Sequence, residues 1–184
     1  MKIVAFNGSP RKTAACATLI ESLCAGARAK GHTTRVFHLI DQDVKPCIAC
    51  YSCMGHKAEI CSQNDDFIGM AKEIMAADVV VMASPVYMGQ VTGLFKTFFD
   101  RWLTFAEADF SIRHVVGKRF VTIVTSGAPA QQFKEVTEYL KHWVGDFFKL
   151  KHAGSLVAGD LHEPGDIHER HELLREAEAL GRSL

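Results

Sequence analysis

The stretch that decides the fold of this chain is MKIVAFNGSPRK, residues Met1–Lys12. It opens with a short apolar run, Ile3–Phe6, which is typical of a parallel strand buried on both faces of a sheet. The run stops at Gly8 and Pro10, which bend the backbone so that a ligand can approach it closely. We therefore predict a buried first strand that opens into a binding turn.

The segment that follows this turn, Ala14–Ala29, is rich in Ala and Leu and places its apolar residues at helical spacing. The free N–H groups and the dipole at the start of such a helix favour a phosphate. The turn lacks both the Gly-x-Gly-x-x-Gly fingerprint of dinucleotide sites and the Gly-x4-Gly-Lys-Ser/Thr loop of nucleotide triphosphatases. A mononucleotide phosphate is therefore the expected ligand, and the alternative is an ordinary turn with exposed basic residues.

The composition describes an ordinary globular chain. Its 184 residues are enough for one good-sized core, so we expect a single domain over residues 1–184. Lys plus Arg equals Asp plus Glu at 21 each, so no global charge attracts nucleic acid or an anionic membrane. No apolar run reaches the length of a membrane span and no signal peptide precedes the first strand, so we expect a cytoplasmic location with mostly reduced or metal-bound cysteines.

Strand and helix patterns alternate along the rest of the chain. Strands are predicted over residues 3–6, 33–40, 78–84, 120–124 and 152–157, and helices over 14–29, 65–77, 92–105, 131–148 and 166–180. Pro85 is expected to break the third strand and to begin a loop, and residues 41–64 form a long loop of the kind that is usually functional. The alternation predicts an α/β fold, a flavodoxin-like doubly wound parallel sheet of order 2-1-3-4-5 with helices on both faces.

In such a sheet, ligands bind beyond the carboxyl ends of the strands. Three segments fall there: Gly8–Thr13, Pro85–Gln90 and Thr125–Pro129. The first offers phosphate donors, the second offers apolar contacts and backbone N–H groups to an aromatic ring, and the third offers polar groups to the edge of that ring. Flavin mononucleotide (FMN) needs all three. The alternative for Tyr87 is a surface aromatic residue that packs on the next helix.

Several motifs together resemble those of the NAD(P)H-dependent FMN reductases and iron–sulfur flavoproteins. They are Gly8–Lys12, Ser84–Tyr87 followed by Gly93–Lys96 and Asp100-Arg101, and a four-cysteine loop that ends before Asp65-Asp66. The resemblance covers nearly the whole chain. It implies FMN as cofactor, NAD(P)H as co-substrate, and a quinone, flavin, nitro or azo compound, iron or a protein as electron acceptor. An electron carrier that moves single electrons between proteins is the alternative, and a flavin-free regulatory domain is a third hypothesis.

The resemblance also implies which residues contact FMN. The candidate cofactor-binding residues are Ser9, Arg11, Lys12, Thr13, Cys16, Pro85, Val86, Tyr87, Met88, Thr125, Ser126 and Gly127. No catalytic acid or base is assigned, because the flavin carries the chemistry. Family members commonly have Asn, Gly, Asn and Thr or Ser where this chain has Thr13, Ala14, Ala15 and Cys16. Two side-chain donors are lost, so we expect weaker FMN binding that depends on backbone N–H groups, Ser9 and Arg11.

The long loop carries a second candidate site, in which Cys47, Cys50, Cys53 and Cys61 follow the pattern Cys-x2-Cys-x2-Cys-x7-Cys. The first two gaps match the bacterial ferredoxin run, whereas the last gap is longer. The loop resembles the cysteine loop of iron–sulfur flavoproteins, and this resemblance implies a [4Fe-4S] cluster. A structural zinc ion and plain thiols remain alternatives.

Other chemistry-bearing residues have simpler interpretations. Cys16 and Cys24 fit small buried positions on the first helix. His162, His168 and His171 surround the start of a highly charged final helix, where a solvated face is the expectation. Trp102 and its neighbouring Phe residues are expected in the core or at a subunit contact. The resemblance implies a homodimer or homotetramer, and we expect no nucleic-acid or membrane partner.

Overall fold

The computed structural model describes residues 1–184 as alternating strands and helices. The strands are β1 (Lys2–Asn7), β2 (Thr33–His38), β3 (Val79–Tyr87), β4 (Gln90–Val91), β5 (Arg119–Thr125) and β6 (Lys151–Ala158). The α-helices are α1 (Ala15–Arg28), α2 (Phe67–Ala76), α3 (Gly93–Asp100), α4 (Lys134–Leu140) and α5 (His171–Ser183). Shorter helices are η1 (Leu39–Asp41), η2 (Arg101–Phe105), η3 (Ala130–Phe133), η4 (Lys141–Phe147) and η5 (Asp166–Glu169).

The sheet has the predicted flavodoxin-like topology. Five parallel strands lie in the order β2-β1-β3-β5-β6, which is 2-1-3-4-5 when the short β4 is set aside. β1 is central and buried on both sides: Val4 and Phe6 belong to one core cluster and Ile3 and Ala5 to the other. The continuous apolar run of the sequence therefore reflects a strand covered on both faces.

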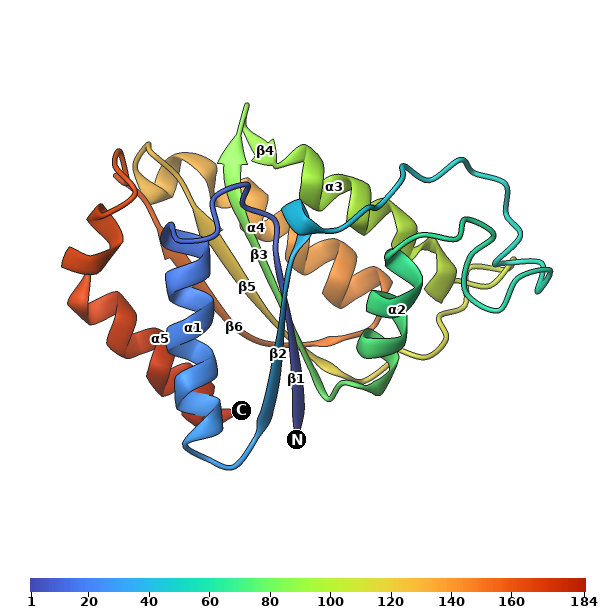
Figure 1. Ribbon diagram of the computed structural model, residues 1–184, viewed down its shortest axis with the longest axis horizontal. Helices are drawn as coiled ribbons and strands as arrows, with labels where there is room; N and C mark the ends of the chain where they lie inside the picture. Colours follow the sequence, from blue (N-terminus) through green and yellow to red (C-terminus); the bar gives the residue numbers. More distant parts are fainter.

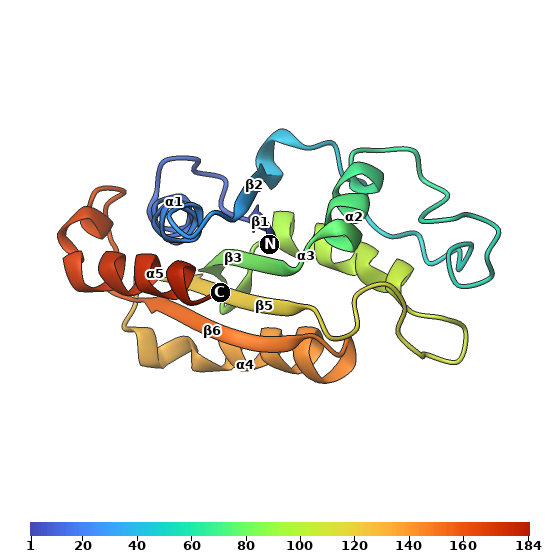
Figure 2. The same ribbon diagram turned by 90° about the horizontal axis from the view of Figure 1, so that it is seen from below.

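Helices cover the two faces of the sheet (Figures 1 and 2). α1 and α5 lie on one face, and α2, α3 and α4 lie on the other. α1 and α5 approach each other so closely that a Cβ added at Gly26 would lie 2.0 Å from the carbonyl oxygen of Glu178. Glycine is therefore required at this crossing, because any larger residue would push the two helices apart.

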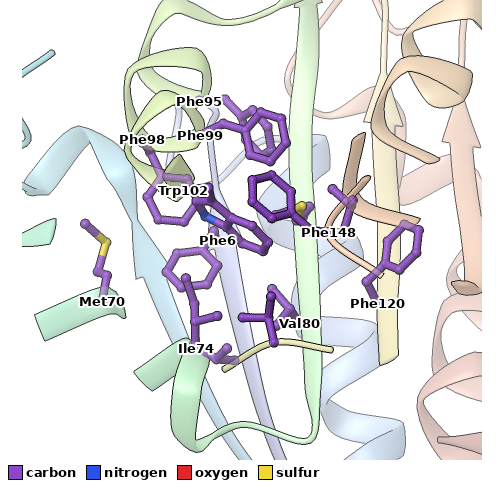
Figure 3. Close-up of a cluster of buried hydrophobic side chains, with 14 of the residues drawn as sticks. Phe6, Met70, Ile74, Val80, Phe95, Phe98, Phe99, Trp102, Phe120 and Phe148 are labelled. Atoms are coloured by element: carbon purple, nitrogen blue, oxygen red, sulfur yellow. The ribbon is translucent and has the colours of Figure 1, made fainter. Parts of the chain in front are cut away.

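The aromatic segment over residues 92–105 is α-helical up to Asp100 and then continues as the 3-10 helix η2. Its side chains point into the core, where the ring of Phe98 lies 4.5 Å from that of Phe6 and 6.3 Å from that of Trp102 (Figure 3). Trp102 and Phe95 are fully buried within the chain itself. These aromatic residues therefore belong to the core and do not offer a subunit contact.

The prediction that Pro85 breaks the third strand is wrong. β3 continues to Tyr87, and Pro85 pairs with Thr125 of β5. β1 ends opposite Ala83, so β3 has only one parallel neighbour at Pro85, and a proline is tolerated at such a position. Beyond it, Tyr87 pairs with Gln90 of β4, so the expected loop is an extension of β3 and a short hairpin.

The long loop, predicted over residues 41–64, spans residues 42–66 without a regular strand or helix, and it projects beyond α2 and α3 (Figure 1). The helix predicted over 131–148 is divided into η3, α4 and the π-helical η4. The helix predicted from residue 166 is likewise divided into η5 and α5. No helix has the length and the apolar character that a membrane span requires.

Candidate functional site

A cavity of about 240 Å³ lies at the carboxyl ends of β1, β3 and β5. Nine of the twelve candidate cofactor-binding residues line it: Ser9, Arg11, Cys16, Pro85, Val86, Tyr87, Thr125, Ser126 and Gly127. The fold therefore brings together three segments that are far apart in the sequence, as the sheet order requires.

The other three candidate residues do not line this cavity. The Nζ atom of Lys12 lies 3.1 Å from a carboxylate oxygen of Asp41, on the surface. Thr13 is exposed, and the side chain of Met88 is fully exposed at the tip of the β3–β4 turn. These three residues are surface groups outside the cavity.

The turn after β1 is held against β3 and α3. The N–H of Gly8 donates to the carbonyl oxygen of Ala83 at 2.8 Å. A Cβ added at Gly8 would lie 2.7 Å from the Cβ of Phe95, so only glycine fits at this approach. Thr92 Oγ1 donates to the carbonyl oxygen of Gly8 at 2.7 Å and accepts from the N–H of Phe95 at 3.1 Å. The position of the turn is therefore fixed by its neighbours.

The start of α1 supplies unused donors to the cavity. Ala14, the N-cap residue, has an extended backbone and no side-chain capping bond. The first bond from α1 back to the cap runs from the N–H of Thr18 to the carbonyl oxygen of Ala14, so the N–H groups of Ala15 and Cys16 find no acceptor in the chain. Both residues line the cavity. Unpaired N–H groups at a helix start match the needs of a phosphate group, so the donors present fit the phosphate of FMN.

Cys16 connects this helix start to the end of β5. Its Sγ lies 3.3 Å from Thr125 Oγ1, and both side chains are buried. Burial raises the pKa of the Cys16 thiol to about 12, and this effect outweighs the hydrogen bond to Thr125, which lowers the pKa. The thiol is therefore neutral at physiological pH and serves as a packing and hydrogen-bonding group, not as a nucleophile.

One part of the cavity wall was missed from the sequence: residues 161–164, after β6, also line it. His162 is exposed, as predicted, but it also lies beside Gly127, whose added Cβ would be 3.9 Å from His162 Nδ1. Asp166 fixes this loop by accepting the N–H of His162 at 2.8 Å and that of Glu163 at 2.9 Å. These residues could have been predicted from their position alone, because the loop follows the carboxyl end of the fifth parallel strand, where ligands bind in this fold. His168 and His171 are exposed, as predicted.

A larger hollow of about 770 Å³ lies between the end of β6 and the start of α5. Its charged side chains are of both signs, including Arg170, Arg175, Glu172 and Glu176. It lies away from the junction of β1 and β3, where ligands bind in this topology. We therefore assign the candidate cofactor site to the smaller cavity.

The four cysteines of the long loop line a second, small cavity of about 20 Å³. Cys53 is buried, Cys47 and Cys61 are half-buried, and Cys50 is exposed; none forms a disulfide. No three His, Cys, Asp or Glu side chains are grouped as ligands of a single metal ion. The donors around the cavity are thiols without histidine or carboxylate, and such a set fits an iron–sulfur cluster.

The thiols of this loop differ in their ionisation. Hydrogen bonds from Ser52 and Ser62 lower the pKa of the exposed Cys50 to about 7. Burial instead raises the pKa of Cys53. Cys50 is therefore more readily ionised than Cys53, and a cationic partner such as iron would favour the thiolate form of Cys53.

Residues 1–163 match the family model described as NADPH-dependent FMN reductase. An iron–sulfur flavoprotein from Archaeoglobus fulgidus is 35% identical over 127 residues, which are 69% of this chain and 60% of the relative. An iron–sulfur flavoprotein from Methanosarcina thermophila is 32% identical over 117 residues, 64% of this chain and 60% of the relative. The matches to these two proteins span about three fifths of their length.

Among solved structures, an NAD(P)H:quinone oxidoreductase from Methanothermobacter marburgensis superposes with a TM-score of 0.76. The match covers 99% of this chain and 98% of that protein at 18% sequence identity. At this identity the likeness establishes the flavodoxin-like fold.

Proposed function

The chain belongs to the NADPH-dependent FMN reductase family, and on this premise we propose that it is an FMN-dependent oxidoreductase that accepts hydride from NAD(P)H. It passes the electrons to a small acceptor, such as a quinone, flavin, nitro or azo compound, or to a redox protein. The observation that carries the proposal is the cavity at the ends of β1, β3 and β5, where unpaired helix N–H groups meet an apolar strand end and a polar loop. FMN, when bound, supplies hydride and single-electron chemistry.

The chain's own residues bind and orient the phosphate. Ser9 Oγ already accepts the N–H of Arg11 at 3.1 Å, so its own hydrogen is free to donate to a phosphate oxygen. Arg11 and His162 are the two side chains on the cavity wall that can carry a positive charge, and Glu163 opposes them. Ala14 and Ala15 offer only backbone N–H groups. Electrostatic attraction at this site is therefore modest, which supports weak and exchangeable FMN binding.

The opposite wall would orient the flavin ring. Pro85, Val86 and Tyr87 offer an apolar surface at the end of β3, and the hairpin with β4 holds it in place. Ser126 Oγ donates to the carbonyl oxygen of Ala128 at 2.7 Å, so its oxygen remains available to accept from a ring N–H. These residues position the ring and exclude water, and none is needed as an acid or base.

A one-electron carrier is the second candidate, and the four-thiol cavity favours it. We propose that Cys47, Cys50, Cys53 and Cys61 hold a [4Fe-4S] cluster, since the two relatives matched above are named iron–sulfur flavoproteins. Such a cluster supplies single-electron transfer. The sequence pattern alone left zinc and free thiols open, and the experiment below separates all three.

The test is purification without oxygen, followed by an absorbance spectrum and by iron, zinc and acid-labile sulfide analysis. Flavin bands that bleach on addition of NADPH or NADH support the reductase, and a nicotinamide that leaves the flavin oxidised supports the carrier. About four irons with matching sulfide support the cluster. Stoichiometric zinc or free thiols overturn the cluster, and a colourless protein that takes up no added FMN overturns both flavin functions.

We also propose that the chain forms a homodimer or homotetramer, as the family resemblance implies. The β3–β4 hairpin supports this, because Tyr87 and Met88 at its tip are 47% and 103% exposed. The zero net charge of the chain argues against an acidic docking face for protein partners. Sedimentation velocity of the wild type and of Met88→Lys tests the proposal, and a monomeric wild type overturns it.

A further inference from the structure

Arg101, the first residue of η2, lies buried beneath the four-cysteine loop. Its side chain is 1% exposed, and that of its partner Asp65 is 0% exposed. The two nitrogens of its fork reach the two carboxylate oxygens of Asp65, at 2.6 and 3.1 Å, and one of them also donates to the carbonyl oxygen of Lys45 at 2.8 Å. The free energy needed to remove two charges from water often exceeds the attraction between them, so a buried ion pair contributes little net stability. This pair therefore suggests a further role.

The second contact of Arg101 is with a thiol. Its Nη2 donates to Cys61 Sγ at 3.2 Å, and Arg101 lines the same small cavity as the four cysteines. Its remaining N–H group, on Nε, is buried and has no acceptor in the chain. A merely structural arginine would be expected to satisfy every buried donor, because an unpaired one costs about 1–3 kcal/mol. The guanidinium therefore has donor capacity left beside the cysteine cavity.

We propose that Arg101 is a positioning residue for an iron–sulfur cluster at the four-cysteine loop, and that it raises the reduction potential of that cluster. This inference rests on the proposed function of the loop. Reduction of such a cluster would add one electron, given by the flavin or by dithionite, to the iron–sulfur core that the four thiolates ligate, and would break no bond and move no proton. The added negative charge strengthens the hydrogen bond and the attraction from a guanidinium at Cys61, so Arg101 stabilises the reduced state more than the oxidised state.

Asp65 fixes the orientation of the Arg101 guanidinium. It accepts the N–H of Lys45 at 3.0 Å and that of Phe67 at 3.2 Å in addition to the fork of Arg101. The guanidinium also lies over the ring of Phe67, with its carbon 4.7 Å from the ring centre. Lysine cannot reproduce the fork, so Arg101→Lys keeps the charge but loses the fixed direction.

The chain offers a matched control in Arg113, which holds the same loop without touching a sulfur atom. Its Nη2 donates to the carbonyl oxygen of Cys53 at 2.9 Å, and its Nε donates to that of Thr104 at 2.9 Å. Its side chain is also largely buried, at 14% exposure. Replacement of Arg113 should therefore loosen the loop, but the guanidinium of Arg101 should stay beside Cys61.

The experiment compares wild type, Arg101→Lys, Arg101→Met and Arg113→Lys after anaerobic loading with iron and sulfide, with the cluster titrated by dithionite and followed by electron paramagnetic resonance. We expect the reduction equilibrium of Arg101→Met to move about tenfold towards the oxidised state, about 59 mV for one electron. Arg101→Lys should recover part of this shift, and Arg113→Lys should show the wild-type potential even if it retains less iron.

Other outcomes separate the inference from the function on which it rests. An unchanged potential in both Arg101 variants with full iron content overturns the role of Arg101 and leaves the cluster assignment intact. Equal shifts in the Arg101 and Arg113 variants also overturn it, because loop loosening would then explain the effect. A wild type that binds no iron and sulfide overturns the cluster itself, and the role of Arg101 with it. If Arg101→Met does not fold, the comparison of Arg101→Lys with Arg113→Lys decides.

Discussion

Thr92 Oγ1 donates a 2.7 Å hydrogen bond to the carbonyl oxygen of Gly8, and this bond joins the turn after β1 to the start of α3. The same oxygen caps α3 by accepting the N–H of Phe95. α3 (Figure 1) continues into η2, and Arg101, the first residue of η2, contacts Cys61 of the four-cysteine loop. The two candidate sites are therefore built on opposite ends of one continuous helical segment, and the buried Thr92 fixes the end at the candidate flavin site.

Replacement of Thr92 by valine keeps the shape of the side chain and removes both hydrogen bonds. We expect Thr92→Val to lower the free energy of unfolding by about 1–3 kcal/mol and to weaken FMN binding, because the Gly8 turn loses its support. Thr92→Ser keeps the hydroxyl and should cost less than half as much. Urea unfolding and quenching of FMN fluorescence measure the two effects, and a Thr92→Val protein equal to wild type would contradict the assignment.

The close approach at Gly8 can be tested against Gly69, a glycine with open space around it. A Cβ at Gly8 would lie 2.7 Å from the Cβ of Phe95, whereas a Cβ at Gly69 in α2 would meet nothing within 4 Å. We expect Gly8→Ala to destabilise the protein by about 1–3 kcal/mol through overpacking. Gly69→Ala should instead stabilise it by about 0.5–1 kcal/mol, because alanine favours the helix. Urea unfolding of both variants tests this difference in sign.

The cysteines of the cluster-free protein should react in a defined order. The pKa of Cys50 is about 7 and its side chain is exposed, so half of it is thiolate near neutral pH. Burial raises the pKa values of Cys16 and Cys24 to about 12 and about 11. Iodoacetamide labelling with peptide mass mapping from pH 6 to 9 should label Cys50 first, with a rate that rises through pH 7, and should leave Cys16 and Cys24 unmodified until the chain unfolds. Early labelling of Cys16 would refute this order.

Most of the fold could be predicted from the sequence because the interior strands β1, β3 and β5 carry buried apolar runs, as Val79–Ala83 shows, and strand order follows from the βαβ connections. The extension of β3 past Pro85 could not, since it depends on where β1 ends opposite Ala83. His162 and Arg101 could not be assigned to a site from the sequence, for a related reason. Their surroundings are created by tertiary contacts with Gly127 and with Cys61, 35 and 40 residues away, which no local pattern records.

The altered phosphate turn predicts that one substitution should strengthen FMN binding. Cys16 lines the candidate cofactor cavity at a position where family members commonly have Thr or Ser, and Ser would offer a stronger donor in the same place. We expect Cys16→Ser to tighten FMN binding about fivefold, equivalent to about 1 kcal/mol for one added hydrogen bond. Cys24→Ser, on the same helix but away from the cavity, is the control and should leave the FMN dissociation constant unchanged. Fluorescence titration measures both, and weaker binding by Cys16→Ser would contradict the assigned position of the phosphate.

The buried pair between Asp65 and Arg101 should make stability depend on acid pH. Burial would raise the pKa of Asp65, but the hydrogen bonds from Arg101 and from the N–H of Lys45 outweigh it and hold this pKa below its ordinary value. The stabilisation is therefore fully present above the unfolded pKa of about 3.9, and it is lost as the pH falls through the lower folded value. Asp65→Asn should cost about 3 kcal/mol at pH 7 by leaving Arg101 without its counter-charge.

Urea unfolding of the cluster-free protein between pH 7 and pH 3 tests this sign. The stability difference between wild type and Asp65→Asn should shrink below about pH 4, because the wild type loses the ionised carboxylate whereas the amide has no proton to gain. Asp146→Asn is the control, since Asp146 is 78% exposed and pairs only with His142. Its effect should be small at every pH. A difference between wild type and Asp65→Asn that stays constant into acid would show that Asp65 contributes through its shape and hydrogen bonds and not through its charge.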